Sequence, residues 1–238
     1  MLIIAIGAFL ALFAYTLISD DSPNANEMHL AISNQAPGFE AEFLLIPREA
    51  EKVNAWEAFW SGKPSAFERI PLRDYSLKDT KLFYYDFGAA KEAEAKSINL
   101  AQYYGPDDIS KEAFLEKKSY YLGTDRYGRD LLSRLVLGAR VSFSVGFLAV
   151  LISLIIGIPL GAIAAYYGGW VDKLILWFIN VVWSIPGLLL VIAITLALGK
   201  GLWQVFIAIG FTMWVEVARV IRGQIMSIRE KEYIQAAK

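Results

Sequence analysis

Side chains able to do chemistry are scarce in this sequence of 238 residues. It contains no Cys and a single His, His29. Without cysteine there is no thiolate nucleophile, disulfide or cysteine-ligated zinc, and one His cannot supply a metal cluster or a catalytic triad. His29 lies in a polar stretch, where a solvated loop residue is expected. The composition therefore argues against an enzyme and predicts no metal site.

A few polar residues interrupt apolar runs in the second half of the chain. Asn180, Ser184 and Glu216 lie in such runs, and polar groups within membrane spans are candidates for a solute path. Glu216 is also three residues before Arg219, so an ion pair along one helix is its plainer expectation. For Asn180, a hydrogen bond to a neighbouring helix is the plainer expectation.

The runs that hold these residues are long enough to cross a membrane. The chain is 56% hydrophobic, above the roughly 45–50% of a soluble domain, and its mean hydropathy is +0.41. Transmembrane helices are expected at residues 1–18, 141–167, 174–198 and 202–218, packed as a helical bundle because unpaired backbone cannot face lipid. Pro186-Gly187 should kink the third span, as a hinge or as packing. Gly157-x-x-x-Gly161 should permit close helix contact.

The amino-terminal run lacks the basic start and the small-residue cleavage site of a signal peptide, so a transmembrane helix is the preferred interpretation. Because Met1 opens directly into the apolar run, we expect the protein to extend further at this end.

The polar stretch at residues 19–120 predicts a small α+β insert domain between the first and second spans. Strands are expected at Phe39–Pro47 and Lys81–Phe87, and helices at Glu49–Trp60 and Ser110–Lys118, the last capped by Ser110. Its carboxylates are scattered among lysines, which is typical of a solvated surface rather than of a catalytic site.

A glycine-rich motif precedes the second span. Gly123-Thr124-Asp125 and Gly128-Arg129-Asp130 predict tight turns, and Thr124, Asp125 or Asp130 can cap a helix. The leucines that follow form one apolar face, so an amphipathic helix lying in the membrane interface is expected within residues 121–140.

This motif resembles the Gly-Thr-Asp-x-x-Gly-Arg-Asp signature of dipeptide and oligopeptide (peptide/nickel) ABC-transporter permeases, inner membrane components of binding-protein-dependent transport systems. The similarity is greatest to their C-type subunit. Further matching motifs follow in the same order, at Tyr166–Asp172, Trp183–Pro186 and Ala218–Gln224. The resemblance extends from Tyr121 to Lys238, whereas the insert is longer than the family leads us to expect.

The resemblance also assigns a role to residues 219–238. Arg229–Lys238 corresponds to the family's cytoplasmic EAA loop, a short helix that docks on the ATPase subunit. Without the family, the same segment would be interpreted as a solvated juxtamembrane helix. The docking residues would be Glu232, Tyr233, Gln235, Ala236 and Ala237, with Gln235 standing where the family has an acid. The family pattern continues into two more spans, so a truncated carboxyl end is also expected.

The fold expected is an all-α polytopic membrane protein of the ABC importer permease type with an extracytoplasmic α+β insert. The resemblance implies half of a peptide translocation path in the plasma (inner) membrane. Its partners would be a second permease subunit, two ABC ATPase subunits and an extracytoplasmic substrate-binding protein, besides the lipid bilayer. ATP and Mg would bind the partners, because this chain has no phosphate-binding loop. A net charge of −1 gives no indication of nucleic acid.

The arginines after residue 218 place the carboxyl end in the cytoplasm. The basic residues at 126–140 oppose this assignment, although long loops cross largely regardless of charge. One alternative is a membrane-anchored sensor or scaffold that acts through residues 19–120. Another is a membrane-embedded hydrolase, which would need a nucleophile–base pair or metal ligands, and the spans contain neither His nor Cys.

Overall fold

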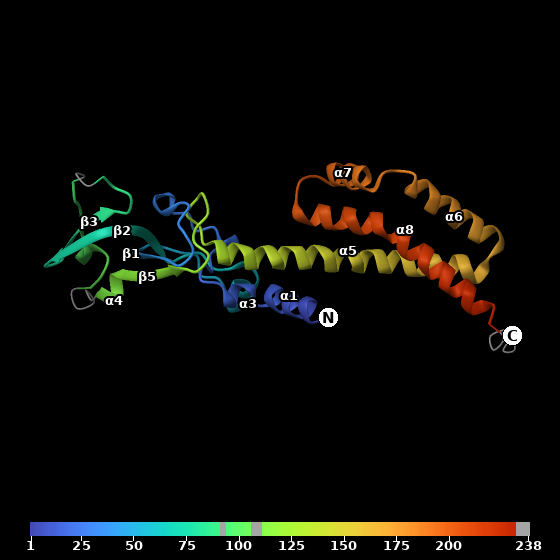
Figure 1. The fold of residues 1–238 in the computed structure, drawn as a ribbon, viewed down its shortest axis with the longest axis horizontal. Coiled ribbons are helices and arrows are strands. Elements are labelled where there is room, and N and C mark those ends of the chain that lie inside the picture. The colour runs from blue at the N-terminus through green and yellow to red at the C-terminus, as the bar shows by residue number, and fades with distance from the viewer. Residues whose placement is uncertain (91–93, 106–110, 232–238) are drawn as a thin grey trace. The chain divides into compact units, whose positions relative to one another are not determined.

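The structure, a computed structural model, describes residues 1–90, 94–105 and 111–231 (Figure 1). The chain forms two compact units, residues 1–141 and 142–238. The first unit contains a β-sheet together with short helices, and the second consists of helices. The chain thus combines a helical unit with a unit that contains a β-sheet, in agreement with the coarse prediction.

The sheet of the first unit has five strands in the order β4-β3-β2-β1-β5, and every neighbouring pair is antiparallel. The strands are β1 (Phe39–Pro47), β2 (Phe67–Lys78), β3 (Lys81–Asp86), β4 (Lys96–Asn99) and β5 (Leu115–Tyr120). Strand β1 has the predicted bounds, and β3 ends one residue earlier than predicted. The sheet therefore links segments from residue 39 to residue 120.

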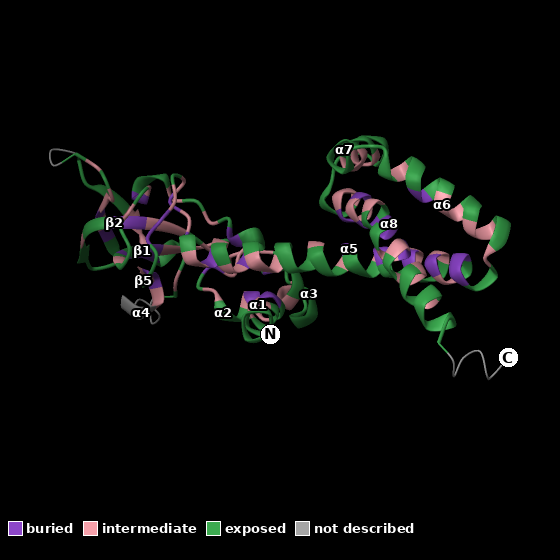
Figure 2. Ribbon diagram, turned by 45° about the vertical axis from the view of Figure 1, so that its right-hand side comes forward, coloured by how far each residue is buried: buried purple, intermediate pink, exposed green. Residues whose placement is uncertain are grey.

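Both faces of this sheet are covered. Successive side chains of a strand point to opposite faces, and Phe43 and Leu44 of β1 are both fully buried. Leu44 packs in one cluster with Leu72, Leu82, Tyr84, Leu100 and Phe114. Phe43 packs in another with Ile32, Ala41 and Tyr120. Figure 2 shows these buried segments within the sheet region.

Two helices expected in this unit have different bounds. The helix predicted at Ser110–Lys118 is wrong beyond residue 114, because α4 (Lys111–Phe114) gives way to strand β5. Pairing of β5 with β1 from Leu115 to Tyr120 outweighs the local helix propensity. The helix predicted at Glu49–Trp60 begins only at Ala55 (α3, Ala55–Ser61), where Asn54 caps it by accepting a 2.8 Å hydrogen bond from Glu57 N.

The amino-terminal run is not one continuous helix. It forms α1 (Leu2–Leu12) and α2 (Ala14–Leu17), separated at Phe13, whose ψ of 21° is not helical. Ala14 is fully buried against Ala25 and Leu137, which fixes the chain direction just after the break. The 11 residues of α1 extend about 16 Å, short of a hydrocarbon core of ~30 Å. The helix predicted over residues 1–18 is therefore interrupted at Phe13, and its crossing of a membrane stays a prediction.

Short 3-10 helices occupy Pro23–Ala25, Leu30–Ile32 and Leu100–Gln102. The long helices are α5 (Leu131–Tyr167), α6 (Gly169–Trp183), α7 (Gly187–Leu198) and α8 (Leu202–Arg229). Of these, α5 and α8 are long and apolar enough to cross a membrane, and α6 with α7 passes the same criterion only as a pair bent by 87°.

These bounds correct two expectations and confirm a third. Residues 131–140 are the first turns of α5 rather than a separate interfacial helix, because α5 continues unbroken through the second predicted span. The predicted span at 174–198 is bent at its Pro-Gly step, as predicted. Helix α8 continues past residue 218 to Arg229.

The Gly157-x-x-x-Gly161 motif brings α5 against α8, as predicted. A Cβ added at Gly157 would lie 2.7 Å from the Trp214 carbonyl oxygen, and one added at Gly161 would meet the Ala218 carbonyl oxygen. Trp214 and Ala218 are buried here together with Ile179 of α6. The backbones can approach this closely only because both positions lack side chains.

Candidate functional site

The two glycines of the motif before α5 adopt backbone conformations that other residues avoid. Gly123 has φ +76° and Gly128 has φ +72°, in the left-handed region. A Cβ on Gly123 would also collide with the carbonyl oxygen of Gln35, and one on Gly128 with that of His29. These positions therefore need glycine for both conformation and space.

Thr124 forms hydrogen bonds to the preceding loop, and Asp125 forms hydrogen bonds within the motif. The Thr124 hydroxyl donates to the carbonyl oxygen of Ile32 at 2.5 Å and accepts from Gln35 N at 2.9 Å. Asp125 accepts from Tyr127 N at 2.8 Å and from Arg129 Nε at 2.8 Å. Partial burial raises the pKa of Asp125, but the bonds from Arg129 and Tyr127 outweigh it, and the pKa lies below its usual value.

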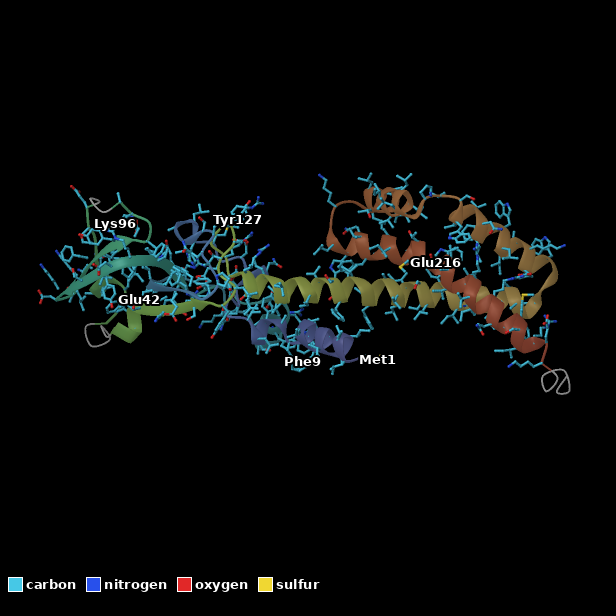
Figure 3. The ribbon with its side chains drawn as sticks, in the orientation of Figure 1. Met1, Phe9, Glu42, Lys96, Tyr127 and Glu216 are labelled. Carbon is cyan, nitrogen blue, oxygen red and sulfur yellow. The ribbon has the colours of Figure 1, made fainter. Side chains whose placement is uncertain are left out.

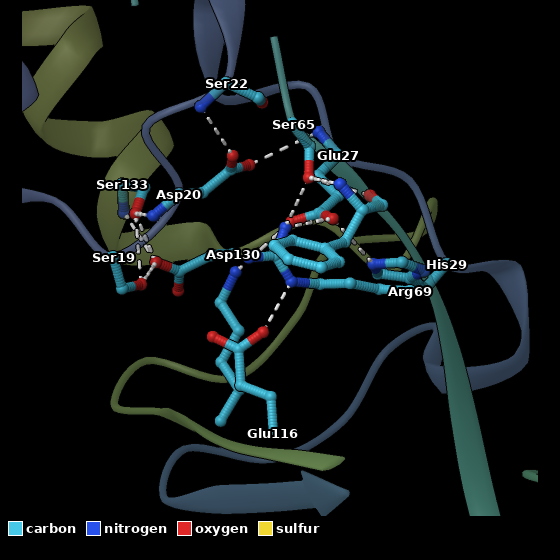
Figure 4. Close-up of polar contacts among 12 residues, drawn as sticks. Ser19, Asp20, Ser22, Glu27, His29, Ser65, Arg69, Glu116, Asp130 and Ser133 are labelled. Atoms are coloured by element: carbon cyan, nitrogen blue, oxygen red, sulfur yellow. Dashed lines mark hydrogen bonds and ion pairs between the residues drawn. The ribbon is translucent and has the colours of Figure 1, made fainter. Parts of the chain in front are cut away.

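Asp130 forms the amino-terminal cap of α5. Its Oδ2 accepts a hydrogen bond from Ser133 N at 3.2 Å and one from the Ser19 hydroxyl at 2.8 Å. Ser133 in turn accepts from Asp20 N at 3.2 Å, as Figure 4 shows. The six motif residues, Gly123, Thr124, Asp125, Gly128, Arg129 and Asp130, thus bond to one another and to residues 19–35. This geometry joins that loop to the start of α5.

A partly buried charge cluster lies beside the motif. Glu27 accepts from Arg69 Nη1 at 2.8 Å, and Lys118 Nζ lies 3.5 Å away; Arg69 Nε donates to Glu116 at 2.6 Å (Figure 4). Burial raises the pKa of Glu27, but His29, Lys118 and Arg69 outweigh that effect and lower the pKa to about 2. Sequence reasoning missed this cluster because its members are far apart along the chain and share no spacing.

Acid should weaken the first unit through Glu27. The pKa of Glu27 is lower in the folded state, so its stabilisation is fully present above the unfolded value near 4.5 and is lost as pH falls toward about 2. The loss should reach up to about 3 kcal/mol. Hydrogen exchange of the β1 amides in detergent-solubilised protein, corrected for intrinsic rates, measures it. The Glu27→Gln variant should be less stable at neutral pH and less sensitive to acid.

Glu40→Gln is the matched control, because Glu40 also pairs with a lysine, Lys117, but both side chains are at least half exposed. It should behave like the unchanged protein, since exposed pairs contribute little. An unchanged pH profile in Glu27→Gln would show that Glu27 is not the titrating group.

The bend between α6 and α7 encloses a second candidate region, the elbow. Pro186 has no N–H to continue the helix, and α7 begins at Gly187. A cavity of about 240 Å³ lies in the elbow. It is lined by Val182, Trp183, Ile185, Pro186, Gly187, Thr212, Met213, Val215 and Glu216. The structure therefore brings the predicted hinge residues and Glu216, labelled in Figure 3, to one place.

The expected ion pair between Glu216 and Arg219 is wrong: within the described residues Glu216 forms no ion pair. Arg219 instead reaches across to α6, where its guanidinium lies 3.5 Å from the centre of the Trp183 ring and donates to Asn180 Oδ1 at 3.4 Å. The Ser184 hydroxyl donates to the carbonyl oxygen of Asn180 at 2.7 Å. Asn180 thus makes the predicted bond to a neighbouring helix.

Two further arginines of α8 hold the other end of α6 and the end of α5. Arg222 donates two hydrogen bonds to the Asp172 carboxylate, from Nε to Oδ1 at 2.5 Å and from Nη2 to Oδ2 at 2.7 Å. Arg229 donates to the carbonyl oxygens of Ala165 at 3.2 Å and Tyr166 at 3.4 Å. Arg219, Arg222 and Arg229, here called the arginine row, therefore tie α8 to two other helices. The matching motifs contain Asp172 and Arg222, but their spacing did not reveal the pair.

The residues predicted to dock on an ATPase, Glu232, Tyr233, Gln235, Ala236 and Ala237, lie outside the described residues. The described chain continues from the end of α8 to Lys231, whose N–H donates to the carbonyl oxygen of Ile228 at 3.1 Å. The arginine row is therefore in the helix that leads directly to this segment.

Comparison with known proteins finds a family match within the second unit. Residues 157–238 match the family described as "Binding-protein-dependent transport system inner membrane component". The chain is 35% identical over 144 residues to the dipeptide transport system permease protein DppC of Bacillus subtilis, covering 58% of this chain and 45% of the relative. It is 44% identical over 119 residues to that of Alkalihalophilus pseudofirmus, covering 50% and 39%.

The oligopeptide transport system permease protein OppC of Bacillus subtilis is 36% identical over 121 residues, covering 51% of this chain and 40% of the relative. The chain thus spans less than half the length of these curated relatives. The resemblance to dipeptide and oligopeptide transport permeases that the motifs predict is confirmed. The matched family is a transport component, which agrees with the prediction that this chain is not an enzyme.

Proposed function

We propose that this chain, in which residues 157–238 match a transport-system inner membrane component, is a permease subunit of an ATP-driven ABC importer of peptides. The observation that supports this function best is the family match over α8 and its neighbours, together with relatives named as dipeptide and oligopeptide permeases. The chain would form half of the path, and ATP with Mg would bind two partner ATPase subunits. No described feature favours the sensor or scaffold alternative.

The arginine row supplies a physical route for coupling. In this proposal the segment with Glu232, Tyr233, Gln235, Ala236 and Ala237 docks on the ATPase, so ATP-driven closure displaces the end of α8. Because α8 is held to α6 through Arg219 and Arg222, α6 moves with it. The elbow at Pro186-Gly187 then allows α6 and α7 to change their angle, and the site opens to alternate sides.

The elbow cavity is the proposed part of the solute path. Its lining includes Glu216; Asn180 lies in the last turn of α6, and Ser184 follows directly after the helix. A carboxylate and hydrogen-bonding groups suit the amino terminus and amides of a peptide. A second permease subunit would complete the path, and an extracytoplasmic substrate-binding protein would deliver the solute. The carboxyl end would be cytoplasmic and residues 19–120 extracytoplasmic.

Co-purification from the native membrane tests this function. Affinity purification of the tagged chain should recover an ATPase subunit, and replacement of residues 232–238 by a Gly/Ser segment of equal length should reduce recovery at least about tenfold, because docking anchors dominate such interfaces.

The Gln235→Glu variant is the matched control, since it restores the family's acid without altering helix length. It should retain the ATPase. Equal ATPase recovery with and without residues 232–238 would contradict the docking proposal, whereas absence of any ATPase from every sample would contradict the importer function itself.

A further inference from the structure

Helix α3 has an apolar face that the protein leaves uncovered. Trp56, Phe59 and Trp60 lie on one side of the helix, and Glu57 and Ser61 lie on the other, as the helical repeat of 100° per residue requires. Trp56 is 72% exposed and Trp60 is 43% exposed, and no residue of α3 is buried. A helix of seven residues is not stable by itself in water. Contacts with other parts of the same chain must therefore hold it in place.

Those contacts hold α3 firmly at its carboxyl end. Gly62 fits against the carbonyl oxygen of Asp21 and the Tyr15 ring so closely that a Cβ would lie 2.6 and 2.7 Å from them. Lys63 N donates to the carbonyl oxygen of Asp21 at 2.9 Å, and its ammonium pairs with the Asp21 carboxylate at 2.9 Å. The orientation of the tryptophan face is therefore fixed by the fold.

The exposed face continues into apolar surface that precedes it in the chain. The Phe59 ring meets Phe13 edge-on at 6.1 Å, and Phe13 lies 4.9 Å from Phe9 of α1. Most large side chains of α1 are exposed, Phe9 among them at 55%; Figure 3 labels this residue. Contiguous exposed apolar surface of this kind marks a membrane or partner contact.

Arg140 places the tryptophans at the boundary of the apolar region. Its guanidinium lies 4.8 Å from the centre of the Trp60 ring and donates to the carbonyl oxygen of Phe59 at 3.3 Å. Arg140 is the last charged residue before a stretch without charge that extends from Val141 to Val171. Tryptophan beside arginine at the start of an apolar span is the composition of a membrane–water interface.

We propose that α3 is a membrane-interface helix whose Trp56 and Trp60 insert among lipid headgroups and the first acyl carbons. Lipid is the favoured occupant because the face is continuous with apolar α1 and is level with the charge boundary of α5. Insertion would hold the sheet domain against the bilayer surface. The inference needs the chain to be membrane-embedded, as in the proposed function, but it does not need transport.

Single-cysteine labelling tests this proposal, because the sequence contains no cysteine. The full chain is reconstituted in nanodiscs of phosphatidylcholine and phosphatidylglycerol with an environment-sensitive fluorophore at Trp56→Cys. Ser61→Cys is the matched control on the opposite face of α3, and Lys78→Cys, in the exposed β2–β3 hairpin, reports the aqueous limit. Trp60→Cys gives a second reading of the tryptophan face.

Labels at 56 and 60 should emit at shorter wavelength than the label at 61, and a nitroxide near the top of the lipid acyl chains should quench them. Aqueous iodide should quench them about threefold less than the label at 78, because interfacial helices lie ~5–10 Å deep. Iodide quenching at 56 equal to that at 78 would overturn the proposal. A blue-shifted label that lipid nitroxides do not quench would instead show a protein covering this face, and would also overturn it.

Discussion

Gly161→Ala should destabilise the crossing of α5 and α8 by about 2 kcal/mol, because overpacking a close contact has a cost of this size. The new Cβ would meet the carbonyl oxygen of Ala218, which is backbone and cannot rotate away. The two helices would have to separate, and Trp214, 5% exposed in this structure, would lose part of its packing. Thermal unfolding in detergent, followed by tryptophan fluorescence, should show Tm lower by about 4–8 °C.

Gly146→Ala separates the effect of the crossing from the effect of alanine in a helix. Gly146 lies on the same helix, and a Cβ there would meet nothing within 4 Å. Alanine favours helix by about 1 kcal/mol relative to glycine, so Tm should stay constant or rise. Gly157→Ala should follow Gly161→Ala, since its Cβ would lie 2.7 Å from the Trp214 carbonyl oxygen. A Tm of Gly161→Ala equal to that of Gly146→Ala would show that the crossing is not this close.

Patterns local in sequence predicted local structure well. Aromatic and branched residues gave the bounds of β1, and the spacing of Gly157 and Gly161 predicted a close helix contact that the structure places between α5 and α8. The glycines of the motif before α5 were also assigned correctly to turns. In each case the physical requirement, a period or the lack of a side chain, is contained in a few adjacent residues.

Features set by distant contacts could not be predicted in this way. Residues 115–118 have helix-forming composition, yet pairing with β1 makes them a strand. The break at Phe13 directly precedes Ala14, which packs against Leu137, more than a hundred residues away. Arg219 binds Trp183 and Asn180 instead of Glu216, because packing of α8 against α6 offers a partner that spacing along α8 does not reveal.

Breaking the pair of Asp172 and Arg222 should abolish most transport if the arginine row couples α8 to α6. Arg222→Lys keeps the charge but cannot make both hydrogen bonds to one carboxylate, and Asp172→Asn leaves the half-buried guanidinium without a counter-charge. Side-chain exposures of 18% and 20% and two charge-assisted hydrogen bonds make the interaction stronger than an exposed surface pair. We expect uptake of a labelled dipeptide to fall at least about tenfold, which corresponds to ~1.4 kcal/mol.

Two further variants and a measurement of ATP hydrolysis distinguish coupling from loss of a folded subunit. Lys173→Gln removes an exposed charge next to Asp172 and should leave uptake unchanged. The double variant that carries both Asp172→Arg and Arg222→Asp should recover part of the uptake that either single change removes. It restores the ion pair with the two charges exchanged. ATP hydrolysis by the purified complex should persist in Arg222→Lys while uptake is lost, since the defect lies between the ATPase contact and the elbow. Joint loss of ATPase binding and uptake would instead assign the pair a role in subunit stability, and full uptake in Asp172→Asn would remove the arginine row from the mechanism.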